Sequence, residues 1–270
     1  MALEILTIAS SSKGNCIGIK NGSHIILIDM GISLCHLKTA LLAHRINIEN
    51  IDAVIITHEH SDHILGLKTL LKHYNIPIYT HRDTMSAICS RLMLDVKSYD
   101  ISETGFSIGE IDIQPFRTRH DAVYSLGYSF MDNSGKISIA TDLGVVTDGV
   151  MNNIKGSDIV FLESNHDVKM LKCGDYPQHI KNRILSNVGH ISNDTCAETS
   201  MKLVDSGTRT IILGHLSENN NTRRLAYSVT AEELNRHGVV IGRDVLIDVA
   251  ASNSVYVRYS TEDSELRKII

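Results

Sequence analysis

Thr57-His58-Glu59-His60-Ser61-Asp62-His63 is the stretch that decides the fold of this chain, and it directly follows an apolar segment. Imidazole and carboxylate groups are the usual protein ligands of zinc, iron and manganese. His58 and His60 point the same way in an extended segment, because side chains repeat every two residues. Asp62 and His63 lie at the turn into a helix and can face a second ion. One tetrahedral ion cannot take all four side chains and still admit a substrate, so the stretch predicts two divalent metal ions.

Metal-competent side chains also follow other apolar segments. They are Asp29 after 24–28, His120 after 111–116, Asp142 after 136–140 and His215 after 209–213. Catalytic residues commonly lie on loops at strand ends, where a rigid sheet holds them. Because similar chemistry ends five separate strands, the pattern favours one shared site over coincidence. Asp142 is the natural candidate for a carboxylate that bridges two ions, although aspartate is also common in turns.

The rest of the pattern predicts a layered α/β domain. Strands are expected over 2–10, 16–20, 24–28, 51–56, 76–79, 111–116, 124–130, 136–140, 158–162, 209–213 and 245–249. Apolar spacing predicts helices over 34–45, from residue 64, and over 81–98, 181–185 and 194–204. Neither a linker nor a repeat divides the chain. We therefore expect one domain over residues 1–270, with an exposed charged tail over about 261–270.

Composition excludes several classes of protein. The net charge of −5 argues against a strongly basic nucleic-acid coat protein, but it leaves room for a local basic groove. The five cysteines include no CxxC pair, so reduced thiols are expected rather than a disulfide framework. A secretory signal and an apolar run of the ~20 residues that span a membrane are both missing. These features predict a cytoplasmic protein with no membrane partner.

The order of the motifs resembles the metallo-β-lactamase superfamily, and the resemblance extends from about residue 5 to residue 250. It rests on HxHxDH after a hydrophobic strand, followed by a lone histidine, an aspartate and a last histidine. It implies a four-layer αβ/βα sandwich, with two mixed sheets and helices on the outer faces. It also implies a first metal held by His58, His60 and His120, a second held by Asp62, His63 and His215, and Asp142 as the bridge. Asp29 would orient the metal loop from behind, unless it only forms the turn before Gly31.

Shorter segments resemble a narrower group. Residues 10–16, 162–167, 189–193 and 213–220 together resemble the YycJ/WalJ group, compact bacterial members regarded as 5′→3′ exodeoxyribonucleases. Gly189-His190-Ile191-Ser192-Asn193 also resembles the extra histidine motif of phosphodiesterases such as the tRNA 3′-processing endonuclease. The equivalent histidine there lies near the scissile phosphate. Lys13 and 221–224 depart from the group's pattern near the expected substrate rim, which bears on substrate preference and not on metal binding.

The resulting hypothesis is a dinuclear-metal phosphodiester hydrolase, in its most specific form a 5′→3′ DNA exonuclease. Zinc or manganese would be the metals, with iron as a third choice, and DNA or another phosphodiester the partner. Asp62 would orient the attacking hydroxide or accept its proton, and His190 would contact a phosphoryl oxygen or protonate the leaving oxygen. The other candidates are His166 for catalysis, Glu163 as a carboxylate behind the ligands, and Ser12, Lys13, Asn15 and Arg223 for substrate binding.

Other interpretations of the same residues stay open. His190 could simply start a helix, His166 could be hydrogen-bonded scaffold, and Lys13 and Arg223 could be solvated charges. The substrate could instead be a small or cyclic-nucleotide phosphodiester, an RNA precursor, or a thioester or lactone. A non-enzymatic scaffold is disfavoured because none of the expected ligands is missing. The pattern fixes neither the native metal nor the oligomeric state.

Overall fold

Two mixed β-sheets form the centre of the computed structural model, which describes residues 2–96, 98–251 and 257–261. The first sheet has the order β14-β1-β2-β3-β4-β5-β6, with β14 (Val257–Ser260), β1 (Leu3–Ala9), β2 (Cys16–Asn21), β3 (His24–Ile28), β4 (Ile51–Ile55), β5 (Ile78–Thr80) and β6 (Tyr99–Asp100). The second has the order β13-β12-β11-β10-β9-β8-β7, with β13 (Leu246–Val249), β12 (Thr210–Gly214), β11 (Ile159–Glu163), β10 (Gly135–Ala140), β9 (Leu126–Asp132), β8 (Ile111–Arg117) and β7 (Phe106–Ile108).

Each sheet changes from antiparallel to parallel pairing halfway across. β1, β2 and β3 pair antiparallel, whereas β3, β4 and β5 pair parallel. β8, β9 and β10 pair antiparallel, whereas β10, β11, β12 and β13 pair parallel. Within each parallel half, the carboxyl ends of the strands meet at one edge. The loops that leave this edge carry most of the residues that sequence analysis selected.

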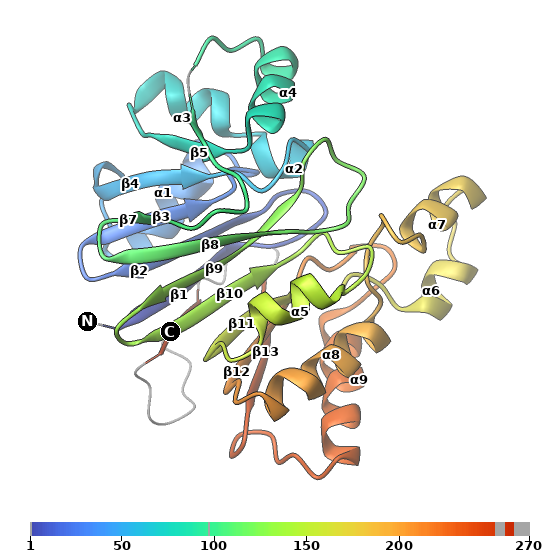
Figure 1. Cartoon of the computed structure of the whole chain (residues 1–270). Coiled ribbons are helices and arrows are strands. Elements are labelled where there is room, and N and C mark those ends of the chain that lie inside the picture. Colours follow the sequence, from blue (N-terminus) through green and yellow to red (C-terminus); the bar gives the residue numbers. More distant parts are fainter. Residues whose placement is uncertain (1, 97, 252–256, 262–270) are drawn as a thin grey trace.

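Helices cover the outer face of each sheet, which gives four layers (Figure 1). The first sheet is covered by α1 (Leu34–Ala43), α3 (Leu67–His73) and α4 (Arg82–Leu92), and the second by α5 (Asp148–Ile154), α8 (Asn193–Asp205) and α9 (Arg223–Arg236). Three apolar clusters fill the spaces between the layers. The central cluster joins the inner faces of both sheets and contains the fully buried Tyr128 and Phe130. This architecture confirms the predicted sandwich.

Short helices lie at the edge where the loops converge. The single turn α2 (Ser61–Ile64) begins inside the HxHxDH stretch. The 3₁₀ turn η1 (Ile48–Asn50) precedes β4 and therefore lies at the opposite, amino end of that strand. α6 (Val168–Cys173) and α7 (Gln178–Ile184) project from the second sheet beside this edge (Figure 1). The interval between β11 and α8 therefore forms an arm instead of the plain loop and short helix that the sequence suggested.

The structure differs from the sequence prediction in several elements. The helix expected over 81–98 ends at Leu92, because Met93 takes a left-handed conformation with φ of 51° and closes its last turn. α9 was not predicted, since its buried positions include small or polar residues such as Ala226 and Thr230 and give weak periodicity. α5, α6 and β14 were also not predicted. Of the expected tail, residues 262–270 lie outside the described residues.

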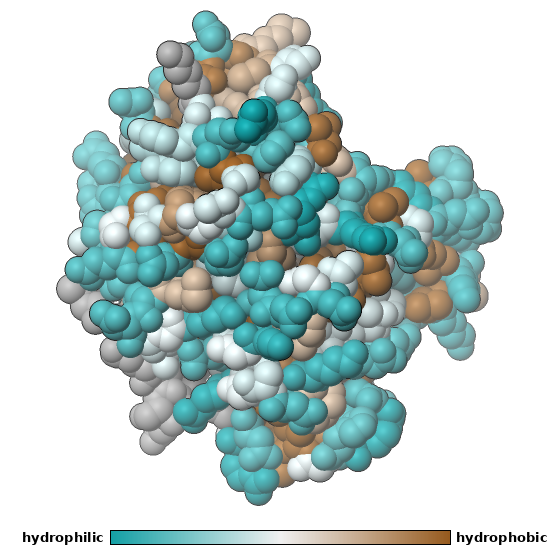
Figure 2. Space-filling view, viewed as in Figure 1, coloured by the Kyte–Doolittle hydropathy of each residue, from teal (hydrophilic) through white to brown (hydrophobic). Residues whose placement is uncertain are grey.

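The face of the molecule drawn in Figure 2 is mostly hydrophilic. Hydrophobic atoms are interspersed at its right-hand edge, where Figure 1 places α6 and α7. Among the helices of residues 2–96, 98–251 and 257–261, none combines the length and apolar character needed to cross a membrane.

Candidate active site

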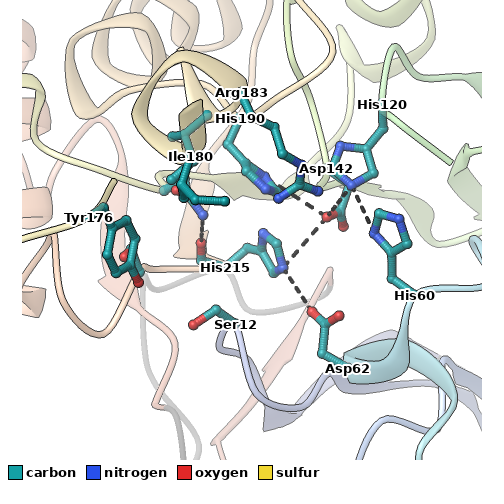
Figure 3. A pocket seen from close by; sticks show the side chains of 13 residues that line it. Ser12, His60, Asp62, His120, Asp142, Tyr176, Ile180, Arg183, His190 and His215 are labelled. Carbon is teal, nitrogen blue, oxygen red and sulfur yellow. Dashed lines mark hydrogen bonds and ion pairs between the residues drawn. The ribbon is translucent and has the colours of Figure 1, made fainter. Parts of the chain in front are cut away.

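The histidines and aspartates selected from the sequence converge at the edge where the loops leave both sheets (Figure 3). Asp29 follows β3, and the HxHxDH stretch follows β4. From the second sheet, His120 follows β8, Asp142 follows β10 and His215 follows β12. Asp29 and His215, which are 186 positions apart in the chain (215 − 29), therefore share one site because two sheets end at the same place.

His58, His60 and His120 form one group whose ligand atoms lie within 4.8 Å of one another. Nδ1 of His60 is 3.2 Å from Nε2 of His120. Nδ1 of His58 is 3.0 Å from the Thr57 hydroxyl, which leaves Nε2 of His58 for a ligand. This group is the one that the superfamily resemblance implied for a first metal.

Asp62, His63 and His215 form a second group within the same distance limit. Oδ2 of Asp62 is 3.3 Å from Nε2 of His63 and 3.6 Å from Nε2 of His215. Asp142 lies between the two groups. Its Oδ2 is 3.5 Å from Nε2 of His63, and its Oδ1 is 3.5 Å from Nε2 of His120. The Asp142 carboxylate thus lies close to members of both groups.

The donor atoms of this site fit divalent metal ions. Nε2 of His58, Oδ2 of Asp142 and Nε2 of His215 are buried and have no hydrogen-bond partner. Buried polar atoms are nearly always paired, so these three unpaired ligand atoms fit a site that binds a cation. Imidazole and carboxylate donors with no thiolate suit zinc, manganese or iron. The residues present therefore support divalent metal binding.

Groups behind the ligands fix the orientation of each ring. Oδ2 of Asp29 accepts from Nδ1 of His63 at 2.7 Å, and the Gly189 carbonyl accepts from Nδ1 of His120 at 3.1 Å. Oε1 of Glu163 accepts from Nδ1 of His215 at 2.8 Å. Because an acceptor holds Nδ1, the lone pair of each of these rings is on Nε2 once the ring is neutral, and Nε2 faces the site.

Glu163 also holds His190, the histidine of the 189–193 motif. Oε1 of Glu163 accepts from Nδ1 of His190 at 2.8 Å, the same distance as from His215. Burial opposes ionisation of this carboxyl, but His190 and His215 outweigh burial and lower the pKa of Glu163 to about 2. One buried carboxylate therefore positions a metal ligand and a second histidine beside it.

Electrostatics divide the histidines into neutral and protonated ones when no cation is bound. Burial lowers the pKa of His58, so its ring is neutral. Burial also disfavours charge on His63, but Asp62 and further carboxylates outweigh burial and raise its pKa well above the ordinary value. Burial opposes ionisation of Asp142, yet His215 and its neighbours hold the Asp142 pKa well below the usual range. A cation entering the site must therefore displace protons.

Three of the converging residues have left-handed backbone conformations. Asp29, Asp142 and His215 have φ values of 62°, 56° and 56°. Such conformations are uncommon outside glycine and persist where the surrounding structure fixes them, often at functional sites. Each one turns the chain sharply after a strand and directs the side chain inward. Gly31 completes the first of these turns, because a Cβ there would lie 1.6 Å from the Asp62 carbonyl oxygen.

A cavity of about 230 Å³ opens onto the converging ligands (Figure 3). It is lined by Ser12, His60, Asp62, His120, Asp142, Asn165, Tyr176, Ile180, Arg183, Ile184, His190, His215 and Ser217. The sequence did not mark Asn165, Tyr176, Ile180, Arg183, Ile184 or Ser217 as site residues. The fold brings the α6–α7 arm to the ligands, and an ordinary tyrosine, isoleucine or arginine carries no motif that would have signalled this.

Of the four residues predicted to bind substrate, only Ser12 lines this cavity. The Asn15 amide donates to Asp62 Oδ2 at 3.1 Å, so Asn15 orients a candidate ligand. Lys13 is exposed and pairs with Glu218. Arg223 donates to the Val249 carbonyl and borders a neighbouring pocket. The predicted rim therefore differs from the cavity that the tertiary structure forms.

His166 also lies outside the lining of the cavity. Its ring is 1% exposed, and neither ring nitrogen has a hydrogen-bond partner. Burial lowers the pKa of His166 to about 4, so the ring is neutral. His166 therefore does not line the cavity, whereas His190 does.

Fold and site together define a metal-dependent hydrolase. Residues 24–216 match the family described as the Beta-lactamase superfamily domain. The structure is similar to that of the metallo-β-lactamase fold protein YhfI from Bacillus subtilis, with a TM-score of 0.70, 16% identity and coverage of 96% of this chain and 99% of the other. Zn²⁺-bound PqqB from Methylobacterium extorquens has a TM-score of 0.67 and 15% identity, covering 94% and 99% of the two chains. These two likenesses concern the fold alone.

The sequence comparison is more specific. Exodeoxyribonuclease YycJ of Bacillus anthracis is 34% identical over 245 residues, which cover 90% of this chain and 93% of the relative. Exodeoxyribonuclease WalJ of Streptococcus pneumoniae is 35% identical over 242 residues, covering 88% and 90%. The chain therefore belongs to the metallo-β-lactamase superfamily and, within it, to the YycJ/WalJ-type group, as its motifs had suggested.

Proposed function

We propose that this hydrolase is a dinuclear-metal 5′→3′ DNA exonuclease. The observation that carries the proposal is the position of His190 and Arg183 on the wall of the cavity that contains the metal-ligand groups. A hydrogen-bond donor and a cation beside a metal site are what a transferring phosphoryl group requires. The names of the YycJ and WalJ relatives support DNA as the polymer and exonucleolytic cleavage as the activity.

Two divalent ions, when bound, would neutralise charge on the phosphoryl oxygens and lower the pKa of an attacking water to about 7. His58, His60 and His120 would hold one ion, and Asp62, His63 and His215 the other, with Asp142 between them. Asp62 would have a second role besides metal ligation. Its carboxylate lines the cavity and is steered by the Asn15 amide, so it can orient the water or accept its proton.

His190 can act on the leaving oxygen. The Glu163 carboxylate holds Nδ1 of His190, so Nε2 is the nitrogen that remains for a ligand in the cavity. A buried carboxylate at Nδ1 fixes the orientation of the ring, as the aspartate does for the histidine of a Ser-His-Asp triad. Nε2 of His190 would then donate a proton to the 3′ oxygen of the terminal nucleotide as that oxygen departs, which leaves a 5′-mononucleotide as the product.

Arg183 supplies positive charge from the arm. Its guanidinium forms a forked pair with Asp121, in which one nitrogen is 2.8 Å from Oδ1 and a second contacts Oδ2. The pair keeps the guanidinium over the cavity and leaves further N–H groups for a phosphate. The cavity of about 230 Å³ is smaller than the ~300–1,000 Å³ that encloses a drug-sized ligand, which suits one terminal nucleotide better than a duplex.

Hydrolysis of labelled oligonucleotides tests this function. Metal-stripped protein is refilled with Zn²⁺ or Mn²⁺ and given 5′-phosphorylated single- and double-stranded DNA labelled at the 3′ end. We expect a ladder that shortens from the 5′ end with release of mononucleotides. Asp142→Ala should abolish cleavage, and His190→Gln should reduce its rate by 10²–10⁴-fold, the usual contribution of a general acid.

His237→Ala is the matched control, because this exposed histidine lies on the surface at the end of α9 and should leave the rate unchanged. Shortening of the DNA from its 3′ end would contradict the proposed 5′→3′ polarity. If the protein cleaved a small phosphodiester or RNA but left DNA intact with every metal, the proposal that DNA is the substrate would be wrong. The assignment as a metal-dependent hydrolase would be unaffected.

A further inference from the structure

An apolar wall closes the side of the cavity away from His60 and His120 (Figure 3). The wall consists of Tyr176, Ile180 and Ile184. Ile180 and Ile184 lie one helical turn apart on α7, and Tyr176 precedes that helix. Phosphate chemistry needs charge and hydrogen bonds, so it gives no reason for an apolar surface here. The wall therefore calls for an apolar part of the substrate.

The apolar wall is anchored to the same loops that carry the site. The Tyr176 hydroxyl accepts from the Asn219 amide at 2.9 Å, four residues after the ligand His215. Ile184 is 7% exposed, and its carbonyl accepts from the His190 backbone N–H at 3.0 Å. These contacts fix the position of the apolar wall relative to His190 and to the loop that carries His215.

Tyr176 is the member of the wall that offers a flat π-face. Its side chain is half-buried, so part of the ring faces the cavity. Aromatic rings bind single-stranded nucleic acid by stacking on bases, and this stacking tolerates any sequence because every base has a π-face. An exonuclease that removes one nucleotide after another needs this kind of recognition.

We propose that Tyr176 is the substrate-positioning residue that receives the base of the terminal nucleotide, whichever base it is, with Ile180 packing at the edge of that base. The inference rests on the proposed function and names its substrate-recognition element. The sugar and base would lie along the apolar wall, while the terminal phosphodiester faces Arg183, His190 and the metal-ligand groups. Nucleotides with a base should therefore bind more tightly than the same sugar phosphate without one.

Isothermal titration calorimetry on the zinc-loaded full chain tests whether Tyr176 binds a base, and it requires no cleavage of DNA. The probes are dAMP, the product of 5′→3′ digestion, and 2-deoxyribose 5-phosphate, which lacks the base. We expect wild-type protein to bind dAMP about tenfold more tightly, within the range of one base–aromatic stack. Tyr176→Ala should bind both probes equally, whereas Tyr176→Phe should keep most of the preference because the ring remains.

Tyr227→Ala is the control, because this tyrosine is 38% exposed on α9 and does not line the cavity. It should leave both affinities unchanged. Equal binding of the two probes by wild-type protein would overturn the proposal without any variant, and so would an unchanged preference in Tyr176→Ala. Wild-type protein could cut no DNA and still bind dAMP more tightly than 2-deoxyribose 5-phosphate, with the difference lost in Tyr176→Ala. In that case the proposed function fails, and the proposal that Tyr176 receives a base is supported.

Discussion

Replacing Glu163 with glutamine should uncouple the two histidines that this carboxylate holds. Glu163 is fully buried and accepts four hydrogen bonds. Oε1 accepts from Nδ1 of His190 and of His215, both at 2.8 Å, and Oε2 accepts from the backbone N–H of Leu143 at 2.8 Å and of Ile191 at 3.3 Å. All four partners are donors, and a glutamine amide has only one acceptor atom.

Either orientation of the amide therefore satisfies at most two of the four donors. Each buried donor left without a partner costs about 1–3 kcal/mol, so we expect Glu163→Gln to lose roughly 2–6 kcal/mol of unfolding free energy. His215 could relieve the clash by moving its proton to Nε2, but that removes the lone pair directed at the metal. Loss of such supporting contacts typically weakens metal affinity or activity by about 10–100-fold.

Urea unfolding of the metal-free protein measures the loss of unfolding free energy, and competition with a zinc chelator measures the loss of zinc affinity. Asp52→Asn is the control, since Asp52 accepts from the Ile25 N–H at 2.7 Å and lies 3.4 Å from His24 Nδ1, remote from the metal ligands. It should leave zinc affinity unchanged. Wild-type unfolding free energy together with wild-type zinc affinity in Glu163→Gln would refute the argument.

Four further predictions follow from close contact, metal binding and burial. Gly31→Ala should cost about 3 kcal/mol or more and lower the thermal midpoint by roughly 6–12 °C, because its Cβ would lie 1.6 Å from the Asp62 carbonyl oxygen. Chelation should destabilise the protein, and zinc at about 100 times its Kd should restore about 2.7 kcal/mol. Because the pKa of His63 is raised, zinc must displace a proton, so affinity should fall as pH is lowered from 8 to 6. At pH 8 a thiol reagent should label the exposed Cys35 but not Cys196, whose pKa burial raises to about 12.

The following results would contradict the predictions on Gly31, on the pH dependence of zinc affinity and on thiol labelling. Gly149→Ala is the matched glycine control, because its Cβ would meet nothing closer than 3.6 Å, so an equal loss in both glycine variants would remove the steric argument. A zinc affinity independent of pH would show that His63 is unprotonated before the metal binds. Mass mapping that finds labelled Cys196 in folded protein would contradict its burial.

The superfamily and the order of the candidate ligands could be predicted from the sequence because both are local patterns. Thr57–His63 concentrates metal donors in a few residues, and Asp29, Asp142 and His215 each directly follow an apolar strand. Strands and turns depend mainly on residues that are close in the sequence, so their patterns can be recognised in a single chain. The predicted sandwich is confirmed for the same reason.

The tertiary structure alone decided which residues face the ligands across the cavity. Tyr176 and Arg183 lie on an arm between two strands, and their contacts with Asn219 and Asp121 join positions 43 and 62 residues apart. The sequence instead suggested Arg223, which donates to the Val249 carbonyl. Ligands follow strands and are marked by their chemistry, whereas the walls of a cavity are made by packing between distant segments, and packing leaves no local pattern of ordinary residues.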